Sequence, residues 1–165
     1  MDQMACSLAD TTAALMLDTR SLSFERVPLP LSCALVVIDS GLTHHHASGD
    51  YATRRAECAE AARLLGVAEL RDIDDLARVQ TLPSPLERRA RHVVTENRRV
   101  LQTADALRRS DLSRAGQLFQ ESHASMRDDF AVSVPPIDEL VRLSLRVQGV
   151  YGARMTGGGC SVSTT

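Results

Sequence analysis

The sequence predicts an α+β fold, because short strand patterns come first, several helical patterns follow, and a strand pattern returns near the end. The chain has 165 residues, of which 44% are hydrophobic and 24% charged, a composition typical of globular proteins. This length is enough to bury one sizeable core. We therefore expect one domain, or the larger part of a two-domain protein.

Charge and composition argue against two classes of partner. The formal net charge of -2 gives no positive field for a phosphate backbone, and only 3% of the residues are aromatic rings that could stack on bases. No apolar run approaches the roughly 20 residues that span a bilayer, and the first residues lack a basic segment followed by an apolar one. We expect a cytoplasmic protein with no nucleic-acid partner and no membrane partner.

The cysteines are widely spaced, and no Cys-x-x-Cys pair suggests zinc or a redox-active dithiol. A nucleophilic cysteine would need a nearby base, which the sequence does not show. We therefore expect reduced thiols with packing roles at Cys6, Cys33, Cys58 and Cys160.

The first part of the chain has the pattern of a short helix, a hairpin and one apolar strand. Residues 2–9 predict the helix, and residues 13–18 and 22–27 predict two strands around a turn. A Pro-Leu-Pro segment then ends the hairpin, because proline has no N–H for the strand ladder. Residues 34–38 are continuously apolar and predict a central strand that is buried on both faces.

The middle of the chain has the apolar period of helices. Residues 51–65 predict a helix that ends at Gly66, and residues 86–107 predict the longest helix. We interpret the outer face of the longer helix, with seven arginines from Arg88 to Arg109, as solvated surface rather than as an anion site. The predicted inner stripes are Tyr51, Ala52, Ala56, Ala59, Ala62 and Leu65, with Arg54, Arg55, Glu57, Glu60 and Arg63 outward, and then Leu86, Ala90, Val93, Val94, Asn97, Val100, Leu101, Ala104 and Leu107.

Two more helices and a strand complete the pattern. Asp111 can cap the first of these helices, and Pro135-Pro136 begins the second. Residues 151–156 alternate as a strand does and lead into a run of three glycines. The stripe that Asp111 precedes is Leu112, Ala115, Leu118, Phe119, Ser122 and Met126.

Five phrases of the sequence carry a family resemblance. They are Met1-Asp2-Gln3-Met4; Asp39-Ser40 followed by Gly49-Asp50-Tyr51-Ala52-Thr53-Arg54-Arg55-Ala56-Glu57-Cys58; Arg91-His92-Val93-Val94-Thr95-Glu96-Asn97; Glu121-Ser122-His123-Ala124-Ser125-Met126-Arg127-Asp128-Asp129; and Gly152-Ala153-Arg154-Met155-Thr156-Gly157-Gly158-Gly159. Because they occur together, in order and at compatible spacing, the chain resembles the C-terminal two-fifths to one-half of a bacterial galactokinase, a member of the GHMP small-molecule kinase superfamily.

The resemblance implies a fold, a domain division and a reaction. Residues 1–33 would be the end of the N-terminal domain of a GHMP kinase. Residues 34–165 would be its C-terminal domain, an antiparallel sheet packed with several helices, truncated after the glycine motif. The implied reaction transfers the γ-phosphoryl group of ATP, bound with Mg²⁺, to the C1 hydroxyl of galactose or a related sugar.

The resemblance also assigns parts of a sugar site. Asp2 matches a carboxylate beside the C1 hydroxyl, where it would aid proton loss, and Tyr51 matches a tyrosine that contacts the sugar. Gly157, Gly158 and Gly159 match a loop that closes near the sugar and the phosphates. The residues alone also permit plainer interpretations: a helix cap for the carboxylate, a half-buried tyrosine at a helix start, and an ordinary glycine turn.

Two histidine patterns have weaker functional readings. Three consecutive histidines, His44, His45 and His46, cannot all face one ion, and no carboxylate or cysteine accompanies them, so we predict no metal site. We expect His123 and Arg127, four residues apart on a helix, to brace that helix against its neighbours rather than to take part in chemistry.

The sequence also departs from the galactokinase pattern. The family's arginine and Gly-Glu-His motif and its Gly/Ser-rich phosphate loop are absent, and no other nucleotide cradle replaces them. After Gly159 the chain continues with Cys160 rather than with Phe-Gly-Gly, which suggests a truncated or frameshifted gene. We therefore expect little kinase activity from this chain alone, together with open strand edges and self-association. The alternatives are a non-catalytic sugar-sensing regulator or remnant, and a kinase for another sugar.

Overall fold

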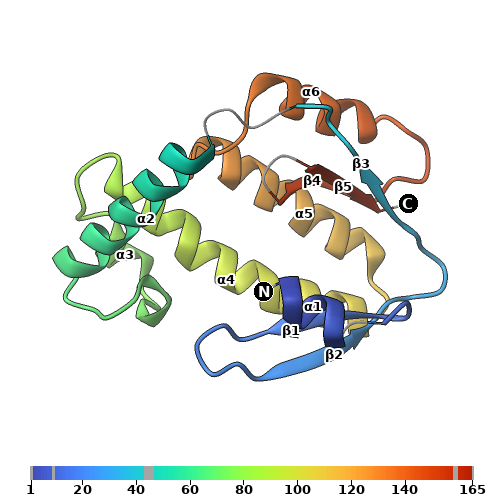
Figure 1. Ribbon diagram of the computed structural model, residues 1–165, viewed down its shortest axis with the longest axis horizontal. Coiled ribbons are helices and arrows are strands. Elements are labelled where there is room, and N and C mark those ends of the chain that lie inside the picture. Colours follow the sequence, from blue (N-terminus) through green and yellow to red (C-terminus); the bar gives the residue numbers. More distant parts are fainter. Residues whose placement is uncertain (1, 9, 43–46, 158–159, 165) are drawn as a thin grey trace.

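The computed structural model describes residues 2–8, 10–42, 47–157 and 160–164, and it confirms the α+β class (Figure 1). No helix among these residues is both long enough and apolar enough to cross a bilayer. The helices are α1 (Asp2–Leu8), α2 (Ala47–Leu64), the 3₁₀ turn η1 (Leu70–Asp72), α3 (Leu76–Val79), α4 (Leu86–Arg108), α5 (Leu112–Asp128) and α6 (Pro135–Ser144), and the strands are β1 (Ala13–Leu17), β2 (Phe24–Pro28), β3 (Leu35–Ile38), β4 (Gly152–Thr156) and β5 (Cys160–Thr164).

Helix α4 lies at the centre of the molecule and contacts α2, α3, α5 and β2 (Figure 1). The hairpin of β1 and β2 lies on one side with α1, and the sheet of β3, β5 and β4 lies on another with α6. Helix α5 contacts both α4 and β4. Side chains from α4, α5 and β4 can therefore meet in the interior.

The hairpin confirms the two predicted N-terminal strands. Strands β1 and β2 are antiparallel, with Ala13 opposite Pro28 and Leu17 opposite Phe24. Leu22, expected at the start of the second strand, instead lies in the turn with φ of 60°. The hairpin's apolar side chains include the buried Val27, which faces the helices.

Strand β3 corrects the prediction of a buried central strand. The order of the three-stranded sheet is β3-β5-β4, so β3 forms an edge and β5 is the middle strand. Leu35 is 56% exposed and Val37 is 63% exposed. An apolar run predicts a strand but not its position in the sheet, because burial depends on which elements cover it. The sequence pattern did not predict β5 at all, since Val162 is the one large apolar residue in it.

Helix α2 is present, but its inner face differs from the prediction. The expected inner residues Tyr51, Ala52 and Ala56 are exposed, whereas Arg54 and Glu57, expected to face outward, turn inward. The side chain of Glu57 is only 18% exposed because it pairs with Arg89 of α4, with 2.9 Å between Nε and Oε2. An alanine-rich helix has a weak apolar stripe, and this ion pair joins the middle of α2 to α4.

The main apolar core lies where the C-terminal half of α2 meets η1, α3 and α4. Cys58 packs against this core, and burial raises the pKa of its thiol, so the thiol stays protonated at neutral pH. This agrees with the predicted packing role. The core residues are Ala61, Ala62, Leu65, Leu70, Ile73, Val79, Leu82, Ala90 and Val94.

Two glycines allow α5 to lie directly against β4. A Cβ added at Gly116 would be 2.1 Å from the Tyr151 carbonyl oxygen, and one added at Gly152 would be 2.2 Å from the Gly116 carbonyl oxygen. The close approach of α5 and β4 fixes the strand against the helix that carries several buried polar groups.

The structure also confirms both predicted helix starts. Asp111 accepts a 3.0 Å hydrogen bond from the Arg114 amide at the start of α5, and α6 begins at Pro135.

Candidate functional site

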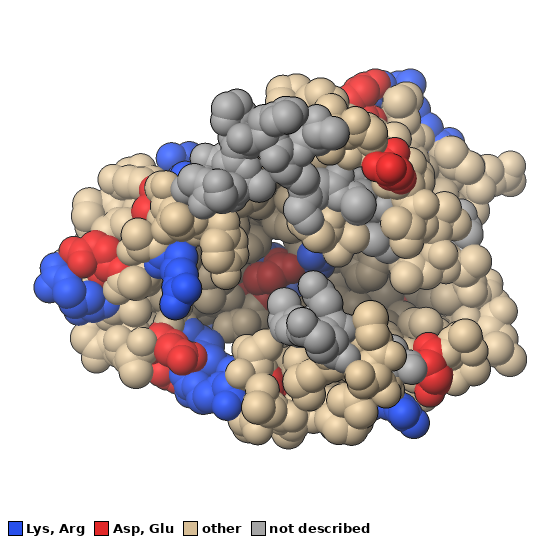
Figure 2. All heavy atoms as spheres, in the orientation of Figure 1, with Lys and Arg blue, Asp and Glu red and all other residues tan. Residues whose placement is uncertain are grey.

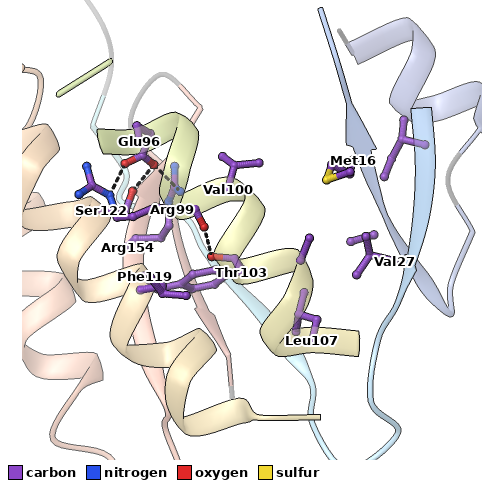
Figure 3. Close-up of a pocket in the computed structure, with 14 residues that line it drawn as sticks. Met16, Val27, Glu96, Arg99, Val100, Thr103, Leu107, Phe119, Ser122 and Arg154 are labelled. Carbon is purple, nitrogen blue, oxygen red and sulfur yellow. Dashed lines mark hydrogen bonds and ion pairs between the residues drawn. The ribbon is translucent and has the colours of Figure 1, made fainter. Parts of the chain in front are cut away.

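A half-buried carboxylate joins α4, α5 and β4 at the centre of the molecule (Figure 3). Glu96 of α4 accepts a 2.5 Å hydrogen bond from the Ser122 hydroxyl of α5. The same Oε1 atom accepts from Arg154 Nη1 of β4 at 3.3 Å, and Oε2 accepts from Arg99 Nε at 2.8 Å. We call these four residues the Glu96 network.

The Glu96 network keeps its charges although it is largely enclosed. Burial opposes ionisation of Glu96, but the hydrogen bonds from Ser122 and Arg99 outweigh this effect and lower the pKa of the carboxyl. Burial also lowers the pKa of Arg154, and the charge of Glu96 opposes that change. The guanidinium of Arg154 lies 6.0 Å from the centre of the Phe119 ring.

A second polar cluster lies one turn away on the same two helices. His92 Nδ1 is 2.9 Å from the Ser125 hydroxyl, which donates to Asp129 Oδ2 at 3.1 Å. Because that hydroxyl has only one hydrogen, His92 is the donor to Ser125. The imidazole stacks on Phe130 with 4.4 Å between ring centres, and burial lowers its pKa to about 4. His92 is therefore neutral at neutral pH.

This second cluster does not have the geometry of a hydrolase triad. In such a triad the carboxylate holds the imidazole and the imidazole takes the serine proton. Here Asp129 contacts the serine instead, and it is also held by Arg91 at 2.9 Å. The cluster consequently serves to hold α4 against α5.

A cavity of about 170 Å³ opens beside the Glu96 network, between the hairpin and helices α4 and α5. Figure 2 shows acidic and basic side chains at the bottom of a central hollow in this face of the molecule. The polar residues lining the cavity are Glu96, Arg99, Thr103, Ser122 and Arg154, and the remaining walls are mostly apolar.

The structure describes the residues predicted for the sugar site only in part. Asp2 is the first residue of α1, as the predicted helix over residues 2–9 has it, but its side chain lies outside the described part. The Tyr51 side chain is 72% exposed near the start of α2 rather than half-buried. Gly158 and Gly159 also lie outside the described residues. The sugar-site roles of Asp2, Tyr51 and the three glycines therefore stay predictions.

Gly157 follows β4 directly and has φ of +59°, a conformation that favours glycine. A Cβ at this position would meet nothing within 4 Å. The backbone conformation, rather than crowding, is thus the reason for glycine here. This position lies three residues after Arg154, so the Glu96 network holds the strand that leads into the glycine run.

His123 braces the fold, as predicted. Its Nδ1 accepts a 3.4 Å hydrogen bond from the Met155 amide of β4, and its Nε2 is 3.2 Å from Asp138 of α6. Burial lowers the pKa of His123, so the contact with Asp138 joins a neutral imidazole to a carboxylate and is not an ion pair, and it is poorly aligned for a hydrogen bond. Arg127 pairs with its neighbour Asp128 at 2.7 Å on the surface. The three histidines from 44 to 46 lie outside the described residues.

The described residues do not fit Mg²⁺ or a nucleotide triphosphate. Among them, no group of three or more His, Cys, Asp or Glu side chains could hold a metal ion. The described backbone beside the cavity offers no glycine-rich turn that could wrap around phosphates. No phosphate-binding role is therefore assigned to the residues that line the cavity.

Sequence reasoning missed the Glu96 network and the burial of two arginines. Arg89 and Arg99 were expected on a solvated face, but their side chains are only 6% and 13% exposed. Ser122 offered a clue, because a polar residue occupied a predicted buried stripe. Glu96 and Arg154 both lie inside phrases that carry the family resemblance. The resemblance thus identified the two segments but did not predict that these side chains pair.

Comparisons with known proteins agree on the family resemblance. Residues 103–162 match the family model "GHMP kinases C terminal". The chain is 48% identical over 174 residues to a galactokinase of Roseiflexus sp. (strain RS-1), covering 99% of the chain and 44% of the relative. It is 45% identical over 166 residues to a galactokinase of Mannheimia succiniciproducens, covering 96% of the chain and 43% of the relative.

The fold comparison gives the same result. The structure of Lactococcus lactis galactokinase complexed with galactose superposes with a TM-score of 0.91 at 28% identity, covering 99% of this chain and 45% of that one. The chain thus spans less than half the length of the relatives that it matches. The predicted resemblance and the predicted fold class are both confirmed.

Proposed function

We propose that this chain acts as the C-terminal portion of a sugar kinase. It resembles that portion of the galactokinases, which are GHMP kinases. The proposed reaction transfers the γ-phosphoryl group of ATP to the C1 hydroxyl of galactose. The observation that carries the proposal is the 48% identity to a named galactokinase over 99% of the chain.

In this proposal Asp2 acts on the sugar hydroxyl. An anomeric hydroxyl must lose its proton as the phosphoryl group arrives, and a carboxylate in hydrogen-bond reach can accept that proton or stabilise its departure. Asp2 opens α1, which lies with the hairpin that faces α4 and α5. Tyr51 would contact the sugar with its ring and hydroxyl, since its side chain is exposed and available.

The glycine run would close over the sugar and the phosphates. Gly157 has the positive φ that a tight turn after β4 requires, and Gly158 and Gly159 would continue that turn. ATP and Mg²⁺ would be held mainly by parts of a full-length kinase that lie beyond this chain, since the described residues do not fit them. Residues 1–33 and 34–165 remain the proposed domain division, and a cytoplasmic location remains a prediction.

We propose accordingly that the chain alone has little kinase activity. Most of the catalytic effect in phosphoryl transfer comes from positioning and from charge neutralisation at the phosphates. A chimeric protein tests this directly: the matching 44% of the Roseiflexus galactokinase is replaced by this chain. Galactose-dependent ADP release is then measured for the chimera, for the native Roseiflexus enzyme and for the chain alone.

The acceptor role of Asp2 is tested in the same chimera. Asp2→Asn should lower kcat by about 10²- to 10⁴-fold, because the amide cannot accept the proton. Asp10→Asn is the matched control, since Asp10 lies just beyond α1 and makes only local surface contacts among the described residues: it accepts from the Thr12 amide at 2.8 Å and from the Thr12 hydroxyl at 2.7 Å, and it lies 3.8 Å from Arg26. Equal loss in both variants would contradict the assignment of Asp2.

The other outcomes separate the alternatives. Galactose binding by the folded chimera without turnover would favour a sugar-sensing regulator over a kinase. Turnover with another sugar, and none with galactose, would favour a different specificity. Absence of both binding and turnover in a folded chimera would indicate a remnant and would contradict the proposed function.

A further inference from the structure

The cavity beside the Glu96 network has a charged end and an apolar end (Figure 3). Glu96, Arg99 and Arg154 lie together at one end, on α4 and β4. Met16 and Val27 line the other end, on the hairpin. Pockets that bind small molecules have this composition, with mostly apolar walls and a few polar groups that fix orientation.

Both arginines at the charged end keep donors that the Glu96 network does not use. Arg99 gives its Nε to Glu96 and its Nη2 to Thr95 at 2.9 Å. Arg154 gives its Nη1 to Glu96 and its Nε to the Met155 carbonyl oxygen at 3.1 Å. Within the described residues, Arg99 Nη1 and Arg154 Nη2 donate no hydrogen bond, and both atoms remain in contact with solvent.

The charged end also keeps a net positive charge. Glu96 is the single acidic residue among the described residues that line the cavity, and it faces two guanidinium groups. Its oxygens already accept three hydrogen bonds, from Ser122, Arg99 and Arg154. A ligand ammonium group would therefore meet unbalanced positive charge, whereas a ligand carboxylate would meet two guanidinium groups that each keep an unused donor.

The size of the cavity limits the apolar part of the ligand. An apolar protein cavity of roughly 150 Å³ holds a benzene molecule. The cavity of about 170 Å³ thus suits a body of one six-membered ring. Ala104 and Leu107 of α4 and Phe119 of α5 supply apolar wall between the charged end and the hairpin.

We propose that this cavity binds a small organic anion, a carboxylate attached to a compact apolar body. The carboxylate receives hydrogen bonds from Arg99 and Arg154, and the body packs against Met16, Val27 and Phe119. Tyr51 and Gly157 are not among the described residues that line this site. The test of the proposal measures binding and needs no turnover, so its failure can be distinguished from failure of the sugar-kinase proposal.

The test compares benzoate with benzamide, which has nearly the same shape and no charge. Isothermal titration of the whole chain with benzoate should give saturable binding with a Kd on the order of 1 mM, as small ligands of this size allow. Benzamide should bind at least about 10-fold more weakly, because it lacks the charge that the guanidinium groups attract.

Variants locate the binding. Arg99→Gln should weaken benzoate binding to the level of benzamide, and Ala104→Leu should weaken both ligands by filling the cavity. Arg63→Gln is the matched control, since Arg63 lies on the outer face of α2 with its side chain 68% exposed. It should leave both affinities unchanged. Circular dichroism melts establish which variants are folded.

Three results would overturn the proposal. They are equal affinity of the wild-type chain for benzoate and benzamide, no saturable benzoate binding up to about 20 mM, and unchanged benzoate affinity in a folded Arg99→Gln variant. The first two results need no variant, so the proposal can be contradicted even if Arg99→Gln does not fold.

Discussion

Polarity and burial are related in opposite ways in two regions of the molecule, the α4–α5 interface and the edge strand β3. The two helices enclose polar groups: the charged Arg89 is 5% exposed and the neutral His92 is 8% exposed. Strand β3 instead leaves Leu35, Val36 and Val37 between 39% and 63% exposed. Hydrogen-bonded polar and charged groups thus organise the interior here, while apolar character alone does not bury a strand.

The largest effect on stability should come from removing the Glu96 carboxylate at the α4–α5 interface. Glu96→Ala leaves Arg99 and Arg154 enclosed without their carboxylate, so it should lower the free energy of unfolding by about 3 kcal/mol. Urea denaturation measures the change. Glu60→Ala is the control, since Glu60 pairs only with Arg63 on the surface, and its urea midpoint should match the wild type. Equal effects in both variants would show that the Glu96 network does not hold the fold.

A pH titration should measure how His92 contributes to the free energy of unfolding. Its pKa is about 4 in the folded chain and near 6.5 when unfolded, so below pH 6.5 the unfolded chain takes up a proton that the folded chain does not. Stability should be constant above pH 6.5 and fall by up to about 3 kcal/mol by pH 4. His92→Asn keeps a donor toward Ser125 but cannot titrate. Its stability loss over this interval should be smaller, as urea midpoints at successive pH values will show.

A smaller effect is expected where α5 meets β4. Gly116→Ala places a methyl group 2.1 Å from the Tyr151 carbonyl oxygen, so the helix and strand must move apart at a cost of about 2 kcal/mol. Gly66→Ala is the comparison, because Gly66 has φ of +66° and open space around its Cβ. It should cost about 1 kcal/mol from backbone strain alone. A Gly66→Ala change that costs more, by thermal denaturation, would contradict the packing described.

The smallest effect on stability should occur at β3. Leu35 and Val37 lie two residues apart on this exposed edge strand, so Leu35→Lys with Val37→Lys should change the free energy of unfolding by no more than about 0.5 kcal/mol. The same pair should reduce self-association in sedimentation velocity, because charged residues on an edge strand oppose pairing with a second copy. A large loss of stability would mean that β3 is buried in solution.

Several parts of the fold could be predicted because their causes are local. The Asp111 cap, the proline at the start of α6 and the turn between β1 and β2 each depend on a few neighbouring residues. Periodicity also predicted the inner face of α5, where Leu118 and Ser122 are buried. Neighbouring residues alone were sufficient for these elements.

The errors all concern partners that are distant in sequence. Arg89 is buried because Glu57, on another helix, offers its carboxylate. Glu96 and Arg154 are 58 residues apart, so no local pattern could pair them. The place of β3 at the edge depends on β5, whose sequence has little strand character. The family phrases marked the segments that meet, but only the three-dimensional contacts show how they meet.

The most direct measurement of the central claim identifies the product of the chimeric kinase. Galactose and ATP are incubated with the Roseiflexus chimera that carries this chain, and ³¹P and ¹³C NMR locate the transferred phosphoryl group. Our account predicts a phosphate on the C1 oxygen of galactose, formed by the chimera and lost with Asp2→Asn. A folded chimera that leaves galactose unphosphorylated, or that phosphorylates a different hydroxyl, would contradict it.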